Sequence, residues 1–271
     1  MTERDSPDET EAGAQVPKER EESANTTVFR GVAGYAFAGT DIRADIRQKY
    51  GHESDLLELY AAGSERIVHK WHHYIPIYDR YLSPWRNRPF RFLEIGVSKG
   101  GSLDLWRKYF GPEAVIFGID IDKRCAAYNG ISGQVRIGSQ DDPGFLASVV
   151  AEMGGVDVVL DDGSHAMPHV RKSFEVLFPL LSHGGTYMIE DLHSCYLRRL
   201  GGGYKHPQNF YNFARHMVDD MHRWYHSFGE RLGGLGTECS GIHIHDSICV
   251  FDKNRAYPPT HSWVSAPTST P

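Results

Sequence analysis

Residues 89–102 read PFRFLEIGVSKGGS and place a short apolar run directly before a glycine-rich turn and the start of a helix. The same pattern of an apolar run that ends in glycine or acidic residues recurs at residues 114–120 (AVIFGID), 135–139 (VRIGS), 156–163 (VDVVLDDG) and 185–191 (GTYMIED). Amphipathic helical segments separate most of these runs. Such alternation predicts a parallel sheet that is covered by helices on both faces.

The rest of the chain divides into segments around this core. Residues 1–29 hold eight acidic and three basic residues but few large apolar side chains, which predicts a disordered acidic tail. In residues 30–88, apolar and aromatic side chains recur at spacings of three and four, which predicts a helical cap. Residues 89–257 form the predicted α/β domain. Residues 258–271 are rich in Pro, Ser and Thr and predict a C-terminal tail.

The last part of the α/β domain departs from the strand–helix alternation. Residues 192–237 are aromatic and rich in histidine, and their pattern is helical. Residues 241–253 (GIHIHDSICVFDK) predict two short strands on either side of His245 and Asp246. We therefore expect a helical insert followed by a hairpin.

Charge and composition exclude several classes of protein. The 271 residues carry a formal net charge of −6, most of it in the acidic tail. The sequence therefore lacks the excess of basic residues that is typical of a general nucleic-acid binder. No apolar run is long enough for a membrane span, and no apolar segment typical of a secretory signal lies near residue 1. The cysteines form no CxxC pair, which disfavours a zinc site, and without a secretory signal we expect reduced thiols and a cytoplasmic location. They are Cys125, Cys195, Cys239 and Cys249.

A glycine-rich loop follows the first predicted strand, at the edge of the sheet where open α/β proteins bind ligands. The candidate cofactor-binding residues there are Glu94, Gly96, Gly100, Gly101 and Ser102. The glycines permit a tight turn and a close backbone approach, and the helix that begins near Ser102 offers free N–H groups to an anionic group. The GxxxG spacing differs from the GxGxxG of dinucleotide binders, which disfavours NAD. A glycine-rich turn without a ligand is the alternative.

Two further strand ends extend this candidate cofactor site. Asp120 ends the second strand, and an acid there can accept hydrogen bonds from both hydroxyls of a ribose. Ser139 and Gln140 follow the third strand, where the edge of an adenine would lie. The alternative for these positions is a plain loop that ends in a helix N-cap.

The fourth and fifth strands end in acidic residues that open onto the same crevice. Asp162, Glu190 and Asp191 would converge there, because the two strands are neighbours in a doubly wound sheet. Converging carboxylates repel one another unless a cation lies between them, and oxygen ligands suit Mg²⁺. His165 lies on the loop of Asp162 and can take a proton from an alcohol near such a cation. The alternatives are solvated acids that cap the next helices and a packed histidine, with His169 as the competing base.

The three cofactor loops together resemble those of class I S-adenosylmethionine (SAM)-dependent methyltransferases. The Ser139-Gln140 pair is similar to the adenine contact of the catechol-type members. The resemblance covers about residues 91–253. It implies SAM as the cofactor and an α/β fold with a doubly wound, mostly parallel, Rossmann-like sheet of seven strands. The helical cap and the insert before the last hairpin would be additions to that sheet.

The motif DDGSH at residues 161–165, followed by Glu190 and Asp191, resembles the metal-dependent sugar O-methyltransferases of actinomycete natural-product pathways. These include the mycinamicin and tylosin type and the rhamnose O-methyltransferases. Residues 69–82 (HKWHHYIPIYDRYL) are similar to the capping segment of that family. The resemblance implies that Asp162 and the Glu-Asp pair hold Mg²⁺ and that His165 is the base.

The resemblance implies an O-methyltransferase that uses SAM and Mg²⁺. It would methylate a hydroxyl of a deoxysugar, such as rhamnose, on a glycosylated macrolide, aromatic polyketide or enediyne. Residues 69–81 and 204–225 would cover this small-molecule acceptor, and we expect a homo-oligomer without nucleic-acid or membrane partners. Three alternatives stay open: a catechol or phenol O-methyltransferase, a non-haem iron hydroxylase that uses His165 or His193, and a SAM-binding module without catalysis.

Overall fold

The computed structural model describes residues 35–227 and 234–265. The predicted acidic tail, residues 1–29, lies outside the described residues. The chain separates into two units after Asp41, and the fold below is that of the second unit, from Ile42 onward.

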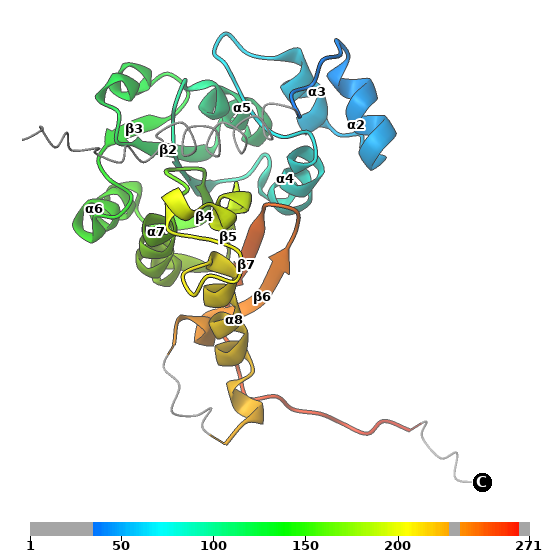
Figure 1. The fold of residues 1–271 in the computed structure, drawn as a ribbon, viewed down its shortest axis with the longest axis vertical. Coiled ribbons are helices and arrows are strands. Elements are labelled where there is room, and N and C mark those ends of the chain that lie inside the picture. The colour runs from blue at the N-terminus through cyan, green and yellow to red at the C-terminus, as the bar shows by residue number, and fades with distance from the viewer. Residues whose placement is uncertain (1–34, 228–233, 266–271) are drawn as a thin grey trace, which may run out of the picture. The chain divides into compact units, whose positions relative to one another are not determined.

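The second unit contains a sheet of seven strands, as the resemblance to class I methyltransferases implies (Figure 1). In space the strands follow the order β3-β2-β1-β4-β5-β7-β6. The neighbours from β3 to β5 are parallel, whereas β7 pairs antiparallel with both β5 and β6. The bounds are β1 Phe90–Ile95, β2 Ala114–Asp120, β3 Gln134–Ile137, β4 Val156–Asp161, β5 Leu181–Ile189, β6 Cys239–Ile244 and β7 Cys249–Lys253.

Helices precede, connect and follow these strands. The bounds are α2 Ile42–Tyr50, α3 Asp55–Ala62, α4 Tyr74–Leu82, α5 Gly101–Phe110, α6 Pro143–Met153, α7 Met167–Leu180 and α8 Phe210–Met221. The local sequence explains where two of these helices begin. The Ser54 hydroxyl accepts a hydrogen bond from Leu57 N–H at the start of α3. The Asp142 carboxylate accepts from two N–H groups at the start of α6, and Pro143 takes the first helical position there. No helix among the described residues combines the length and apolar character that crossing a membrane requires.

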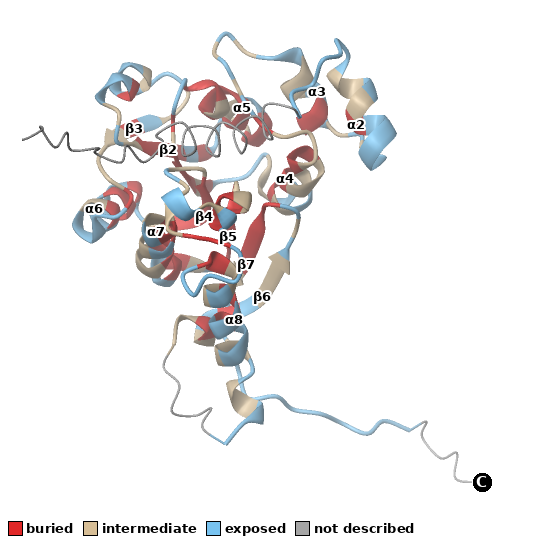
Figure 2. Ribbon diagram, viewed as in Figure 1, coloured by how far each residue is buried: buried red, intermediate tan, exposed pale blue. Residues whose placement is uncertain are grey.

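Alternate residues of the strands point to opposite faces of the sheet and form two apolar cores. Residues such as Ile95 and Ile189 pack with α6, α7 and α8 on one face. Residues such as Phe92 and Met188 pack with α2, α3, α4 and α5 on the other face. Figure 2 shows the central strands as the most buried part of the sheet. The predicted cap and insert thus each cover one face.

The register of the strands brings three of their ends together. Ile95 of β1 pairs with Asp161 of β4, and Asp161 pairs with Ile189 of β5. The residues that follow, Gly96, Asp162 and Glu190, therefore leave the sheet side by side at its carboxyl edge. The chain reverses direction across the sheet between β1 and β4, which is where open α/β sheets bind ligands.

Candidate functional site

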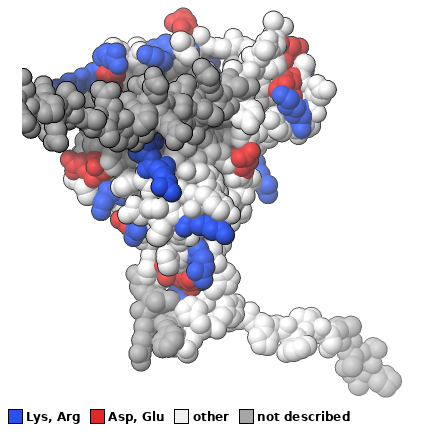
Figure 3. Space-filling model, viewed as in Figure 1, with Lys and Arg blue, Asp and Glu red and all other residues white. Residues whose placement is uncertain are grey.

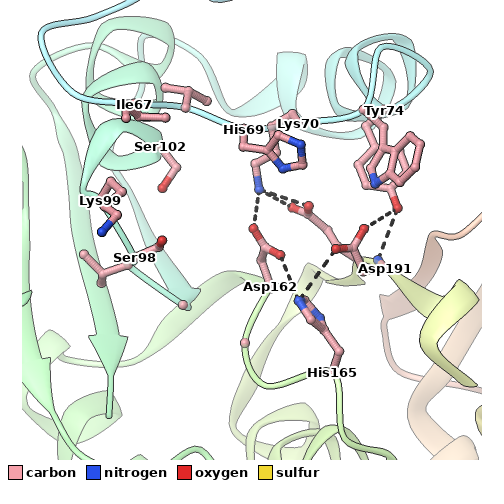
Figure 4. Close-up of a pocket in the computed structure, with 16 residues that line it drawn as sticks. Ile67, His69, Lys70, Tyr74, Ser98, Lys99, Ser102, Asp162, His165 and Asp191 are labelled. Atoms are coloured by element: carbon pink, nitrogen blue, oxygen red, sulfur yellow. Dashed lines mark hydrogen bonds and ion pairs between the residues drawn. The ribbon is translucent and has the colours of Figure 1, made fainter. Parts of the chain in front are cut away.

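A cavity of about 270 Å³ opens at this carboxyl edge. The loops after β1, β4 and β5 form its floor, and the segment that leads into α4 covers it (Figure 4). Its lining comprises Ile67, Val68, His69, Lys70, Trp71, Tyr74, Gly96, Val97, Ser98, Lys99, Ser102, Asp162, Gly163, His165, Glu190 and Asp191.

Three of the predicted site side chains, Asp162, His165 and Asp191, lie close together in this cavity. His165 Nε2 lies 3.8 Å from Asp162 Oδ1 and 3.6 Å from Asp191 Oδ2. One ligand-type atom from each of these three residues lies within 4.8 Å of the other two, which is close enough to surround one metal ion. His165 and Asp191 both adopt left-handed backbone conformations, with φ of 56° and 54°. Such conformations are costly for residues other than glycine and are concentrated at functional sites.

Glu190, the third predicted metal ligand, has a different partner. Lys70 Nζ lies 2.9 and 3.0 Å from the two oxygens of Glu190 and 2.6 Å from Asp162 Oδ2. The Lys70 and Glu190 side chains are only 2% and 1% exposed. Burial alone would lower the pKa of Lys70, but the two carboxylates outweigh it and raise that pKa above its ordinary value. Burial and the charge of Asp162 raise the pKa of Glu190, and Lys70 opposes this rise.

Asp191 is oriented by the helix that follows Lys70. The Tyr74 hydroxyl donates to Asp191 Oδ1 at 2.7 Å and accepts from Asp191 N–H at 3.3 Å. Burial raises the pKa of Tyr74, and the carboxylate of Asp191 adds to the rise, so the phenol stays a hydrogen-bond donor. Lys70 and Tyr74 belong to residues 69–81, which the sequence predicts to cover the acceptor, but neither is among the predicted site residues. The sequence feature that could have pointed to Lys70 is a lysine inside an otherwise mostly aromatic and apolar stretch.

The predicted cofactor loop lies on the other side of the cavity. Gly96 has φ of 96°, and a Cβ atom there would lie 2.1 Å from the backbone oxygen of Asp162, so only glycine fits. Asp120 Oδ2 accepts from the N–H groups of Val97 and Ser98 at 3.0 and 2.9 Å. The acid at the end of β2 therefore holds the glycine loop. Gly96 and Ser102 line the cavity, whereas Asp120 does not.

Glu94 lies beneath this loop and is fully buried. Its carboxylate accepts from the Ser102 hydroxyl at 2.8 Å and from Trp106 Nε1 at 3.0 Å. Burial raises its pKa to about 7, although Lys70 and these two donors oppose the rise. Glu94 therefore reaches the cavity only through Ser102. Of the predicted glycines after it, Gly100 and Gly101 lie outside the lining, and Gly101 packs against the backbone of Ile67.

Gln140 is buried and uses its side chain within the protein. Its Oε1 accepts from Ser164 N–H at 2.6 Å, and its Nε2 donates to Asp161 and Ser173 at 3.2 and 3.3 Å. The amide thus ties the loop after β3 to the DDGSH loop. The Ser139 hydroxyl donates to Asp141. Contact of Ser139 and Gln140 with an adenine stays a prediction.

The competing histidines lie elsewhere. His169 Nδ1 pairs with the Ser164 hydroxyl at 3.0 Å, and His193 Nδ1 pairs with the Ser247 hydroxyl at 2.7 Å. Neither lines the cavity. The group that converges there has one histidine and two carboxylates, whereas a non-haem iron hydroxylase uses two histidines and one carboxylate. The geometry therefore disfavours the hydroxylase.

The sheet order, the glycine loop after β1 and the acidic strand ends define a class I methyltransferase domain. Residues 93–192 match a family described as a methyltransferase domain. The chain belongs to this class, and its relatives within the class are O-methyltransferases of sugar-bearing natural products, which confirms the resemblance seen in the sequence.

Three comparisons illustrate this relationship. The chain is 33% identical over 226 residues to the 8-demethyl-8-(2-methoxy-alpha-L-rhamnosyl)-tetracenomycin-C 3'-O-methyltransferase of Streptomyces olivaceus, covering 78% of this chain and 56% of the relative. It is 33% identical over 201 residues to the mycinamicin VI 2''-O-methyltransferase of Micromonospora griseorubida, covering 68% and 49%. The MycE methyltransferase of the mycinamycin pathway, solved with Mg and SAH, superposes with a TM-score of 0.67 at 32% identity, covering 75% and 55%. The chain spans about half the length of the curated relatives it matches.

Proposed function

We propose that this protein is an O-methyltransferase that uses SAM and Mg²⁺ to methylate a hydroxyl of a deoxysugar on a glycosylated secondary metabolite. The convergence of His165 with Asp162 and Asp191 beside the glycine loop carries the proposal. The relatives support the acceptor class, because their names specify sugar hydroxyls on a macrolide, on oleandolide or on tetracenomycin.

SAM would bind along the loop of Gly96 and Ser102, with Asp120 at the ribose. Asp120 Oδ1 accepts one N–H, from Asp122, and Oδ2 accepts two, so Oδ1 retains a lone pair that a ribose hydroxyl can use. Free N–H groups at the start of α5 would face the carboxylate of the methionine moiety.

Asp162, Glu190 and Asp191 would hold Mg²⁺, as the resemblance implies, and Asp162 and Asp191 would do so through the oxygens that face His165. Carboxylate oxygens and water suit this ion, and the donor atoms lie close enough to share it. The ion would lower the pKa of a bound sugar hydroxyl. Tyr74 keeps Asp191 in place, and Lys70 holds Asp162 from the opposite side (Figure 4).

His165 would take the proton from the acceptor hydroxyl. Its Nε2 distances to both carboxylates exceed hydrogen-bonding length, so this nitrogen is available to a substrate. His69 is a second histidine in the lining, and it is exposed on the covering segment. The segment that covers the cavity would limit the access of water, and the cavity would hold the sugar oxygen in line with the methyl group of SAM.

Mass spectrometry of methylated products tests the proposal. The protein is incubated with SAM and Mg²⁺ and with a panel that contains glycosylated macrolides and tetracenomycin-type compounds, their aglycones, and simple catechols. We expect the glycosides to be methylated and the matching aglycones to remain unmethylated. Methylation of catechols alone would identify the phenol-type alternative, and SAM binding without any product would favour a binding module.

The sequence predictions of a cytoplasmic location, of a homo-oligomer and of no nucleic-acid partner stay predictions. In Figure 3, single basic and acidic side chains are scattered among uncharged ones on the visible part of the described surface.

A further inference from the structure

The segment that covers the cavity also faces the cofactor loop. Residues 67–69, which we call the cofactor wall, line the cavity together with Ser98 and Ser102. Figure 4 shows Ile67 on the same side of the cavity as these two serines. An ideal Cβ atom on Gly101 would lie 2.3 Å from the backbone oxygen of Ile67, so the wall comes this close to α5 only because residue 101 has no side chain. The wall therefore bounds the space where the amino-acid end of SAM would lie.

Arg66 attaches the cofactor wall to the start of α5. Its guanidinium donates to the Asp104 carboxylate in the first turn of that helix and, at 3.3 Å, to the backbone oxygen of Gly100. The same group donates to Ser132 Oγ at 3.4 Å, and its Cζ atom lies 5.4 Å from the ring centre of Tyr128. Arg66 is not part of the cavity lining, so it can act on a cofactor only through the wall.

This ion pair is suited to fixing a distance. The Arg66 and Asp104 side chains are 19% and 11% exposed, so salt in the solvent screens their attraction only weakly. The planar guanidinium holds its donors in a fixed geometry, which a lysine could not reproduce. Replacing a buried ion pair by apolar residues often costs no stability, so the contribution that distinguishes this pair is the geometry that it imposes.

We propose that Arg66 is a positioning residue for the cofactor, which holds the cofactor wall at the distance from α5 that the amino-acid end of SAM requires. The inference rests on the proposed function, because it concerns the cofactor of that reaction. Without Arg66, the wall remains tied at its other end, where the Tyr60 hydroxyl donates to the backbone oxygen of Lys70 at 2.8 Å, but it loses its attachment to α5. The adenosine end of SAM would lie near Asp120, away from the wall, and should not depend on Arg66.

Calorimetry with two ligands tests this role without an acceptor and without turnover. S-adenosylhomocysteine (SAH) contains the amino-acid end, whereas 5′-methylthioadenosine has the adenosine and the sulfur but lacks that end. Arg66→Met removes the guanidinium and keeps an unbranched side chain. We expect this variant to bind SAH about tenfold or more weakly and to change the affinity for 5′-methylthioadenosine by less than about threefold.

The melting temperature separates positioning from general stability. Arg66→Met leaves the Asp104 carboxylate mostly buried with the Ser132 hydroxyl as its donor, which should destabilise the protein. Adding Asp104→Asn removes that charge and should recover most of the lost melting temperature. The SAH affinity of the double variant should stay about tenfold or more below that of the parent, because the wall is still detached. A purely structural role predicts that both quantities recover together.

Gly101→Ala changes the same contact from the side of α5. The added methyl group displaces the wall, whereas alanine itself favours a helix, so SAH should bind about tenfold more weakly and 5′-methylthioadenosine should not. The matched control is Arg91→Met with Asp157→Asn. This ion pair joins the starts of β1 and β4, at the opposite edge of the sheet from the cavity. Its removal should leave both affinities unchanged even where it lowers the melting temperature.

The outcomes separate this inference from the proposed function. A parent protein that binds neither SAM nor SAH would count against the proposed function itself. In a parent that binds SAH, an Arg66→Met variant with unchanged SAH affinity, or with both ligands weakened by the same factor, would overturn the role of Arg66 alone. Recovery of SAH affinity together with stability in the double variant would do the same. If Arg66→Met does not fold, the double variant and Gly101→Ala provide the same comparison of the two ligands.

Discussion

Replacing Glu94 by glutamine should change how the stability of the protein depends on pH. Glu94 is fully buried beneath the glycine loop, and burial raises its pKa from 4.5 to about 7. The folded protein therefore holds this proton more tightly than the unfolded chain does, so the free energy of unfolding falls as pH rises from about 4.5 to about 7. The full effect of such a rise is about 3 kcal/mol, of which about 2.5 kcal/mol falls between pH 5 and pH 8.

The glutamine variant removes this titration and keeps the shape of the side chain. Its amide oxygen can still accept from Trp106, and its amide nitrogen can donate to the Ser102 hydroxyl. Measured by urea unfolding without SAM, Glu94→Gln should gain about 2.5 kcal/mol relative to the parent between pH 5 and pH 8. Glu113→Gln, which replaces an exposed acid, is the control and should show no such gain. A difference between Glu94→Gln and the parent that stays constant over this range would refute the reasoning.

Three further predictions concern binding and catalysis. Asp120→Ala should weaken SAM binding, measured by calorimetry, by about 1–3 kcal/mol. The variant removes a charged acceptor for the ribose and also leaves the N–H groups of Val97 and Ser98 without their carboxylate. Unchanged affinity in a folded variant would contradict the ribose assignment. His165→Gln should lower kcat by about 10²–10⁴-fold while the binding of SAH and Mn²⁺ persists. A larger loss of kcat in His69→Gln would assign the role of general base to His69. Chelation should abolish turnover and Mg²⁺ should restore it, whereas full activity of a protein shown by metal analysis to be metal-free would rule out the metal site.

The order of apolar runs along the chain was enough to predict the sheet and the edge at which the site lies. Each run is long enough for one strand, and the helices between them force parallel neighbours. Since all parallel strands end at one edge, the residues after them must meet there. This rule predicted that Asp162, Glu190 and Asp191 would lie beside the glycine loop, and the structure places all three acids in the lining of one cavity with Gly96.

The tertiary structure alone decided which partner each polar side chain takes. Lys70 lies 92 residues before Asp162 in the chain and reaches it only because the segment before α4 covers the strand ends. Gln140, which the sequence predicts to lie near an adenine, forms hydrogen bonds with Asp161, Ser173 and Ser164 that the sequence does not reveal. The periodicity of each strand and helix depends on residues that are close in sequence, whereas the direction of a buried polar side chain depends on which distant group forms a hydrogen bond with it. The sequence therefore determined where the acids gather, and the packing of the segment before α4 determined which side chain each of them contacts.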